Sequence, residues 1–507
     1  MNQVFQSQTE RSQLKQVLTN WKLTPATMAH RLTDGAFIAA PHLLYISARI
    51  AMGIQRGNAR IIISAPPRHG KSEHTSVHTP VWVLEKYPTK KVILAAYGAD
   101  LATGFSRRVR DMFTEPSNAA LLSTRIRRDA SRVEAFLTQQ GGGMSAVGLG
   151  GPITGRGADV LLIDDYIKEI KEALSQAHRE YIWNWFVTTA YTRLEPNASV
   201  IVIATRWHTD DLIGRMLREF PGEWDYIELP ALAEENDLLG REPGEALFPQ
   251  RYDAETLADI RKTLGSIFFQ ALYQQKPVDE TNKLTDPSWF KHKMLLTEYE
   301  ITRLKWARMW DLAATEEGGD YTVGMLQGYD AATGKTYIPD IQRGQWTPEG
   351  VERRVLLTAQ KDGPNVTIYI EQEPGSAGKA LVEHYKRNVL KDYTVVGVPT
   401  TTKKLIRLQP FLAATEAGDV FLVGDGDWIK PFKEEFDAFP GGANDDQMDC
   451  AGGAYLKLSG KKPYSGAFGR NAASNPTGSA QKNSKNLKSA QINMSQKTRS
   501  SVTFGRR

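Results

Sequence analysis

The stretch from Ile61 to Ser72, which reads Ile-Ile-Ile-Ser-Ala-Pro-Pro-Arg-His-Gly-Lys-Ser, constrains the fold of this chain more than any other. Its apolar start predicts a buried strand, and its end predicts a tight loop that opens into a helix near Lys71. The backbone N–H groups of such a loop and the positive end of the helix together bind polyphosphates. The stretch therefore predicts a P-loop, in which Lys71 reaches the β- and γ-phosphates of ATP and Ser72 holds Mg²⁺.

The loop departs from the usual pattern at its first position. Ala65 stands where G-x-x-x-x-G-K-[ST] has glycine, and two prolines follow it. An ordinary strand–turn–helix connection is therefore the alternative interpretation. Under the P-loop interpretation, the expected ATP-binding residues are those of the loop and one acid from later in the chain: Ala65, Pro66, Pro67, Arg68, His69, Gly70, Lys71, Ser72 and Asp164.

A second motif, Asp159-Val-Leu-Leu-Ile-Asp-Asp165, agrees with the first. Four apolar residues followed by two carboxylates form the Walker B arrangement, in which a buried strand ends at the nucleotide. Asp164 is then expected to reach Mg²⁺, and Asp165 to orient or deprotonate the attacking water. Between the motifs, residues 91–97 predict a strand and residues 101–113 a helix, an alternation typical of a parallel sheet with crossovers.

Two further groups are candidates for catalysis and coupling in this domain. Arg156, in Thr154-Gly-Arg-Gly157, is a candidate arginine finger for its own site or that of a neighbouring subunit, with Arg68 as the alternative. A plain ion pair is an equally good interpretation of either arginine. Residues 199–204 predict a third buried strand, and Thr205 and Arg206 at its end are candidates for coupling hydrolysis to movement.

Composition narrows the class of protein. With 507 residues the chain is too long for one ordinary core, and no apolar run approaches the roughly 20 residues that a membrane-spanning helix needs. Cys450 is the only cysteine, which excludes an internal disulfide. Ten of the 63 Lys and Arg residues and none of the 58 acids lie in residues 459–507, so the rest of the chain carries −5. That tail is expected to be disordered, and a polyanion site elsewhere would be a local patch.

Three motifs in their order along the chain resemble a known family. They are Ala-Pro-Pro-Arg-His-Gly-Lys-Ser72, Gly-Arg-Gly-Ala-Asp159 ahead of Leu-Leu-Ile-Asp-Asp165, and Ala-Thr-Arg-Trp-His-Thr-Asp-Asp-Leu212. Together they resemble the ATPase half of the large terminase subunit of tailed bacteriophages. The resemblance implies an ATP-driven motor that moves double-stranded DNA into a procapsid, and it implies that a nuclease domain follows. It also makes Asp165 a departure, since glutamate is common at the position that activates water.

The second half contains the strands and acids that such a nuclease needs. Residues 304–311, 320–328, 335–342 and 365–371 predict strands, and residues 450–458 predict a small-residue helix. An Asp at the end of the first strand, an acid at the end of a later strand and acids before a final helix follow the chain order of an RNase H-like nuclease. This predicts an α/β protein in which a P-loop ATPase domain with a mostly parallel sheet precedes an RNase H-like domain with a mixed sheet.

The acids of this half are expected to hold two Mg²⁺ or Mn²⁺ ions, because a cluster of like charges is hard to justify without metal. Asp311, Glu371 and Asp445 are the first choice as direct ligands. Asp446 is an open alternative to Asp445. Asp449 is placed slightly further out, as a supporting or capping residue, although it remains a candidate ligand. Solvated strand ends are the alternative interpretation of each acid alone.

The resemblance further implies partners, a location and domain boundaries. The partners would be double-stranded DNA, a small terminase subunit, a portal protein and further copies of the chain in a ring on the portal. The location would be the cytoplasm of the infected bacterium, with transient docking at the procapsid and no place in the mature virion. The boundaries are an arm (1–35), the ATPase domain (36–277), a linker (278–290), the nuclease domain (291–458) and the basic tail (459–507).

Several basic residues are candidate DNA contacts, and two alternative functions remain open. The cations of residues 283–293, together with Lys403, Lys404, Arg407 and Lys430, could line a DNA groove by contacting phosphates, or could simply lie on a solvated face. A DNA-stimulated helicase or remodelling ATPase, whose second domain only binds nucleic acid, is one rival function. An integrase-like strand-transfer enzyme that needs no ATP is another.

Overall fold

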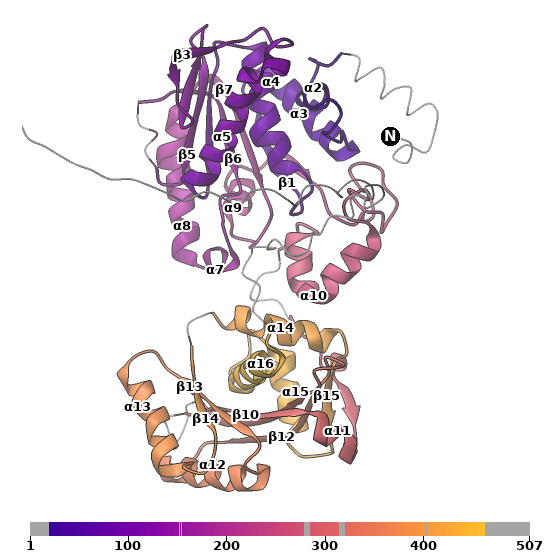
Figure 1. Cartoon of the computed structure of the whole chain (residues 1–507), viewed down its shortest axis with the longest axis vertical. Helices are drawn as coiled ribbons and strands as arrows, with labels where there is room; N and C mark the ends of the chain where they lie inside the picture. The colour runs from indigo at the N-terminus through magenta and orange to yellow at the C-terminus, as the bar shows by residue number, and fades with distance from the viewer. Residues whose placement is uncertain are drawn as a thin grey trace, which may run out of the picture. The chain divides into compact units, whose positions relative to one another are not determined.

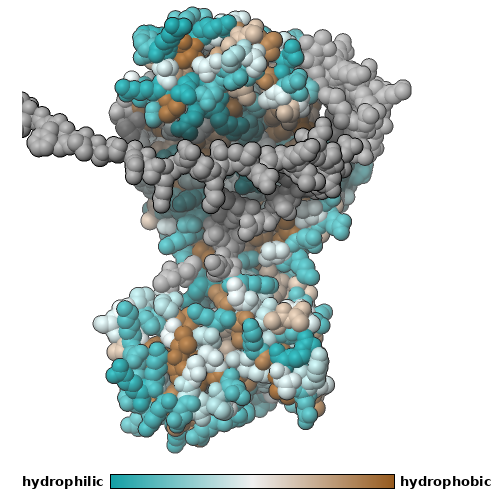
Figure 2. All heavy atoms as spheres, viewed as in Figure 1, coloured by the Kyte–Doolittle hydropathy of each residue, from teal (hydrophilic) through white to brown (hydrophobic). Residues whose placement is uncertain are grey.

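The computed structural model describes residues 20–151, 153, 155–277, 284–313, 320–400 and 403–461, and all structural statements concern these residues. The expected arm up to residue 19, the first part of the expected linker and the tail beyond Lys461 lie outside them. The described chain contains two sheets, each flanked by helices (Figure 1). No described helix is long and apolar enough to cross a membrane. On the face shown in Figure 2, hydrophobic residues of the described part are interspersed with hydrophilic ones.

The first sheet has eight strands in the order β3-β4-β5-β2-β6-β7-β1-β8. Neighbours from β5 to β8 run parallel, whereas β3–β4 and β4–β5 are antiparallel. The strands are β1 (Arg60–Ser64), β2 (Lys91–Ala96), β3 (Ile126–Ser131), β4 (Ala135–Thr138), β5 (Gly143–Gly148), β6 (Ala158–Asp164), β7 (Leu194–Ala204) and β8 (Asp225–Glu228).

Apolar runs explain the central strands of this sheet. Parallel strands covered by helices are buried on both faces, so they read as continuous apolar sequence rather than as an alternation. The isoleucines of β1 and the run Val160–Ile163 of β6 are 0–2% exposed. The helices in this part of the chain are α2 (Pro25–Leu32), α3 (Pro41–Arg56), α4 (Thr79–Lys86), α5 (Ala99–Thr114), α6 (Pro116–Ala119), α7 (Ile170–Ala173), α8 (Gln176–Trp185), α9 (Leu212–Glu219) and α10 (Ala254–Leu272).

The second sheet has seven strands in the order β14-β13-β10-β11-β12-β15-β9. The hairpins β10–β11 and β11–β12 are antiparallel, and the other neighbours are parallel, so the sheet is mixed. The strands are β9 (Lys291–Lys293), β10 (Lys305–Asp311), β11 (Thr322–Tyr329), β12 (Thr336–Gly344), β13 (Thr367–Gln372), β14 (Val395–Pro399) and β15 (Val420–Val423). The helices are α11 (Glu298–Arg303), α12 (Pro348–Asp362), α13 (Ser376–His384), α14 (Lys404–Glu416), α15 (Ile429–Ala438) and α16 (Asp446–Ser459).

The alternation of side chains along β10 sorts them between two cores. Met309 packs into the core that contains residues of α14, α15 and α16, and Trp310 packs into the core that contains residues of α12. Because side chains alternate along a strand, Asp311 returns to the α16 side. On β13 Tyr369 and Ile370 divide in the same way, which places Glu371 on the α16 side as well.

Candidate active sites: a nucleotide cradle and a carboxylate cluster

The first candidate site lies at the carboxyl ends of β1, β6 and β7. Strand β7 pairs with both of the others, so the loop after β1, the acids at the end of β6 and Thr205 after β7 meet at one edge of the sheet. Arg68 (φ 64°) and Gly70 (φ 85°) adopt left-handed backbone conformations within the loop. A Cβ on Gly70 would also lie 3.2 Å from Cδ1 of Leu43, so glycine suits this position in two ways.

The helix after this loop positions two hydroxyls on one acid. The helical segment begins at Lys71 and is π-helical over Glu73–His78 before it continues as α4. Ser72 donates to Oδ1 of Asp164 at 3.0 Å, and Ser76 donates to Oδ2 at 2.5 Å. Burial and, to a smaller extent, the neighbouring charge of Asp165 together raise the pKa of Asp164 to about 7. A buried carboxylate with a raised pKa beside a P-loop serine fits a divalent cation.

Lys71 and Asp165 face the same space. Lys71 is 6% exposed, and its Nζ lies 3.4 Å from Oδ2 of Asp165. Asp165 has φ 41°, an uncommon conformation for a residue other than glycine, and its Oδ1 accepts a hydrogen bond from the backbone N–H of Thr205 at 3.3 Å. The side chain of Thr205 donates to the backbone oxygen of Ala65 at 3.2 Å. The end of β7 is therefore hydrogen-bonded to both the loop and the acid.

The other expected residues of this site make other contacts. The guanidinium of Arg206 is buried and donates to Oδ2 of Asp211 at 2.9 Å, while its backbone N–H donates to Gln275. The ring of His69 stacks on Tyr252 with centroids 5.1 Å apart. Arg68 and Arg156 are exposed, and the structure shows no side-chain partner for either among the described residues. Pro66 is buried and Pro67 is partly buried.

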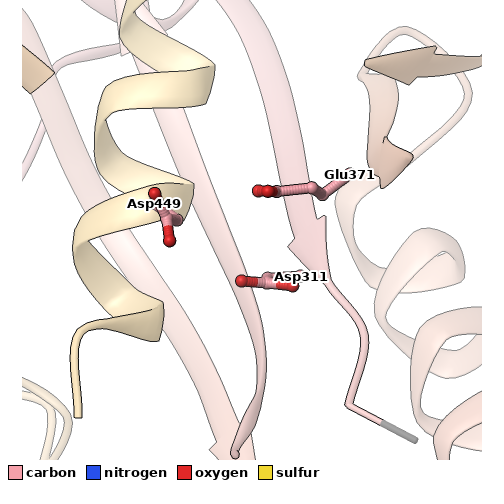
Figure 3. Close-up of side chains that lie close together, drawn as sticks. All are labelled: Asp311, Glu371 and Asp449. Atoms are coloured by element: carbon pink, nitrogen blue, oxygen red, sulfur yellow. The ribbon is translucent and has the colours of Figure 1, made fainter. Parts of the chain in front are cut away.

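The second candidate site joins three carboxylates from three elements. Asp311 ends β10, Glu371 lies near the end of β13, and Asp449 lies in the first turns of α16; one oxygen of each lies within 4.8 Å of the others (Figure 3). The register explains the first pair, because Trp310 lies opposite Ile370 on parallel strands and the next residues are the two acids. Figure 3 shows the three side chains pointing toward one another.

Small residues bring α16 close enough to add its acid. This helix contains Cys450-Ala-Gly-Gly-Ala454. A Cβ on Gly453 would lie 2.9 Å from Cε of Met309 in β10, and a Cβ on Gly452 would lie 2.7 Å from Cδ2 of Leu408 in α14. The helix therefore packs closely against both elements, and a side chain at either glycine would require Met309 or Leu408 to move.

Like charges in this site make ionisation costly. Burial and, to a smaller extent, the nearby carboxylates of Glu371 and Asp449 together raise the pKa of Asp311 to about 8. Burial also raises the pKa values of Asp449 and Asp446. Three convergent carboxylates that are hard to ionise together form a hard oxygen donor set, which fits a divalent cation such as Mg²⁺ or Mn²⁺.

The remaining acids lie beside this group. Asp446 accepts a hydrogen bond from the backbone N–H of Tyr321 at 3.1 Å. Asp445 precedes α16, and its Oδ1 lies 2.5 Å from Nζ of Lys404. The three-residue group thus contains Asp449, which sequence reasoning places slightly outward, and does not contain Asp445. The sequence predicts a helix from Cys450, whereas α16 begins at Asp446, so Asp449 is carried on the helix and faces the strands.

Sequence reasoning missed three partners of these sites. Ser76 lies outside the P-loop pattern, although its position four residues after Ser72 places it on the same helix face. Thr400 donates to Oε1 of Glu371 at 2.8 Å from the end of β14. Arg407, considered only as a DNA contact, lies with its Nη1 3.3 Å from the same oxygen.

Comparison with known families decides the identity. The family described as "Terminase large subunit, T4likevirus-type, N-terminal" matches residues 62–293, and the family described as "Terminase RNaseH-like domain" matches residues 308–458. The chain belongs to the large terminase subunits. The predicted fold class, a P-loop ATPase domain followed by an RNase H-like domain with a mixed sheet, is confirmed. Large terminase subunits are DNA-packaging proteins that combine ATPase and nuclease functions.

Solved structures resemble this terminase at low sequence identity. The large terminase of a thermophilic bacteriophage is 12% identical, with a TM-score of 0.46, and the match covers 83% of this chain and 98% of that one. For the large terminase of bacteriophage HK97 the values are 11%, 0.35, 81% and 93%. For the nuclease domain of the large terminase of bacteriophage SPP1 with bound Mn they are 12%, 0.27, 34% and 98%. Comparison with curated protein sequences finds no match.

Proposed function

We propose that this terminase is a viral packaging motor that hydrolyses ATP to move double-stranded DNA into a procapsid and cuts concatemeric DNA with a two-metal endonuclease. One observation carries the proposal: a single chain holds two separate sets of acids suited to divalent cations. One set lies beside Lys71 and Ser72 at the end of the first sheet, and the other consists of Asp311, Glu371 and Asp449.

In the ATPase site, the loop from Ala65 to Ser72 would bind the phosphates, and Ser72 and Asp164 would hold Mg²⁺. Asp165 would orient or deprotonate the attacking water, and its place beside the γ-phosphate is supported by its carboxylate, which lies 3.4 Å from the ammonium of the P-loop Lys71. Thr205 would pass the state of this site to the loop through its bonds to Asp165 and Ala65.

Neither of the two candidate arginines would contact the phosphates of its own site. Arg206 would hold the end of β7 through its buried pair with Asp211, and so serve coupling through position rather than by touching phosphate. Arg156 is exposed two residues before β6 begins, at the opposite edge of the sheet from Asp164, so as an arginine finger it would act on the site of a neighbouring subunit and not on its own.

In the nuclease site, Asp311, Glu371 and Asp449 would be the direct ligands, with Asp446 and Asp445 completing the set on the side of α16. The bound cations would supply an activated water and stabilise the leaving oxygen of the phosphodiester. The chain's own contribution is to fix the carboxylates: Thr400 would orient Glu371, and the close packing of α16 would hold Asp449.

The proposed partners are double-stranded DNA, a small terminase subunit, a portal protein and further copies of the chain arranged as a ring on the portal. The proposed site of action is the portal of the procapsid in the infected bacterium. Family membership supports DNA and packaging machinery as partners in general.

The two proposed activities can be separated by mutation. Lys71→Ala is expected to lower DNA-stimulated ATP hydrolysis by about 10²-fold or more and to leave Mn²⁺-dependent plasmid cleavage intact, because it removes a transition-state contact of one site only. Asp311→Ala is expected to do the reverse. Lys86→Ala and Asp392→Ala, which remove exposed charges from the same two domains, serve as matched controls.

Each rival function makes a different demand on the same measurements. Plasmid cleavage that persists in Asp311→Ala would contradict the nuclease assignment and favour the helicase or remodelling ATPase. ATP hydrolysis that persists in Lys71→Ala would contradict the motor, because the proposed ATPase site would not account for the activity. The strand-transfer enzyme, which needs no ATP, predicts no DNA-stimulated ATP hydrolysis even in the wild-type chain.

A further inference from the structure

Helix α14 presents two cations to the carboxylate cluster. Nζ of Lys404 lies 2.5 Å from Oδ1 of Asp445 and 2.6 Å from Oδ2 of Asp449. Nη2 of Arg407 lies 2.6 Å from Oδ1 of Asp449, and its Nη1 lies 3.3 Å from Oε1 of Glu371. Lys404 and Arg407 are one helical turn apart on α14, and each bridges two acids. We call this pair of side chains the cationic clasp.

The clasp contacts the same carboxylate oxygens that would bind the metal ions. Both carboxylate oxygens of Asp449 and one oxygen of Glu371 take a cation of the clasp. Divalent ions of this class sit about 2.0–2.6 Å from their oxygen ligands. A cation that close to a carboxylate would face the ammonium or guanidinium at a few ångströms, where like charges repel strongly in a partly buried site.

Burial makes this conflict matter. Asp449 and Glu371 have side chains only 9% and 15% exposed, so water screens the charges weakly. The side chains of Lys404 and Arg407 are 29% and 19% exposed, which leaves each a route to solvent. A lysine or arginine has a long, flexible stem, so the clasp can leave the acids by side-chain rotation while α14 stays in place.

We propose that the cationic clasp of Lys404 and Arg407 competes with divalent cations for the carboxylates of the nuclease site, so that metal binding requires the clasp to open. The proposal rests on the proposed nuclease function. It assigns to these residues a positioning role that limits how readily the site is loaded. It differs from the expected role as plain DNA contacts, because here the two side chains act on the acids themselves.

If the clasp competes with metal, its removal should raise the affinity for metal, and if it supports the ligands, its removal should lower that affinity. A residue that orients a metal ligand costs about 10–100-fold in metal affinity when it is mutated. Mutation of a residue that competes for the ligand should instead increase the metal affinity. Lys404→Gln and Arg407→Gln are therefore each expected to tighten binding of Mn²⁺ by about tenfold, equivalent to about 1.4 kcal/mol.

The measurement is a Mn²⁺ titration of the full chain without nucleotide or DNA, in which electron paramagnetic resonance reports free Mn²⁺. Asp311→Asn identifies the share of binding that belongs to the nuclease site. Lys430→Gln removes one positive charge from an 85% exposed lysine of the same domain, so it controls for net charge. We expect this control to change the affinity less than about twofold.

The outcomes separate the clasp from the function on which it rests. Wild-type binding no stronger than that of Asp311→Asn would overturn the proposed nuclease site, and the clasp with it. Binding that depends on Asp311 but is unchanged or weakened in both clasp variants would overturn the clasp alone. An equal tightening in Lys430→Gln would also overturn it, because net charge would then explain the effect.

A second measurement uses the wild-type chain and needs no variant to fold. Mass spectrometry would follow the rate of reductive methylation of Lys404 relative to Lys430 with and without Mn²⁺. Competition predicts that Mn²⁺ frees Lys404 and raises its relative rate. A relative rate that Mn²⁺ leaves unchanged or lowers would overturn the proposal.

Discussion

At the scale of single residues, Asp311 couples the stability of the fold to pH. Its pKa is about 8 in the folded chain against an ordinary value of 3.8. Between these values the folded state binds more protons than the unfolded state, so the stability contributed by Asp311 is present at low pH and is lost as the pH rises toward 8. In the presence of a chelator, the stability advantage of Asp311→Asn over wild type should therefore grow by about 1–3 kcal/mol as the pH rises from about 4 to about 8. This is less than the full free energy that the pKa shift would give.

Urea unfolding at several pH values measures this difference. Asp392→Asn, an exposed acid of the same domain, should run parallel to wild type across the range. Saturating Mg²⁺ should stabilise wild type and shrink the advantage of Asp311→Asn, because the metal binds the folded state only. A constant gap between Asp311→Asn and wild type from pH 4 to pH 8 would show that burial of this carboxyl is not costly.

Ser76 carries a second prediction at this scale. Its hydroxyl donates to one oxygen of Asp164 while Ser72 donates to the other, so Asp164 is held from both sides. Ser76→Ala should lower kcat for ATP about tenfold and raise the Mg²⁺ concentration needed for half-maximal activity, with little change in KM for ATP. Steady-state kinetics over a Mg²⁺ series test this.

Ser106→Ala is the matched control, because this serine is fully buried in the same domain and its hydroxyl has no hydrogen-bond partner among the described residues. Its kinetics should equal those of wild type. Ser76→Ala kinetics indistinguishable from the control would mean that Ser72 alone orients Asp164.

At the scale of elements, sequence predicted what local pattern determines and missed what packing determines. Apolar runs with acids or turns at their ends predict the buried strands β1, β2, β6 and β7 and the strands β10 to β13. The short strands β3, β4 and β5 were not foreseen, because β3 is largely exposed and polar and exists through its pairing with β4. Local sequence does not contain that partner.

Some residues of the carboxylate cluster are likewise predictable from local sequence, and others depend on packing. Asp311 and Glu371 could be found from sequence because each lies at the end of a strand, where parallel neighbours meet. Asp449 could not be ranked above Asp445, since the choice depends on where α16 begins and on how closely it packs. The cationic clasp was invisible because α14 and the acids meet only in three dimensions.

The packing of α16 carries the prediction for this scale. A Cβ on Gly452 would lie 2.7 Å from Cδ2 and 3.4 Å from Cα of Leu408, which is fully buried, so α16 and α14 must separate to admit it. Gly452→Ala should cost about 1–3 kcal/mol of stability and reduce Mn²⁺-dependent cleavage, because the displaced helix carries Asp449. Urea unfolding and plasmid cleavage measure the two effects.

Gly453→Ala supplies the comparison on the same helix. Its Cβ would meet the flexible end of Met309 at 2.9 Å, and alanine favours a helix over glycine by about 1 kcal/mol, so the net effect should be small. Equal losses in both variants would show that overall helix packing, rather than the contact with Leu408, positions Asp449.

At the scale of the whole molecule, the positive charge of the sequence is concentrated in one segment. Residues 459–507 carry ten Lys and Arg residues and no acid, whereas the rest of the chain carries −5. Both family matches end before or at residue 458, so this basic segment lies beyond the two matched domains. Affinity for the DNA backbone should therefore come largely from the tail, while catalysis should not.

Replacing the ten Lys and Arg residues of this segment with Gln, at unchanged length, tests that division. Counterion release makes log Kd depend linearly on log salt, with a slope of about 0.9 for each DNA phosphate that a cation contacts. Filter binding to a linear duplex over a salt series should show that slope falling by several units in the variant, while ATP hydrolysis without DNA stays at the wild-type rate. An unchanged slope would place the phosphate contacts in local patches of the folded domains instead, since net charge excludes a globally basic surface there.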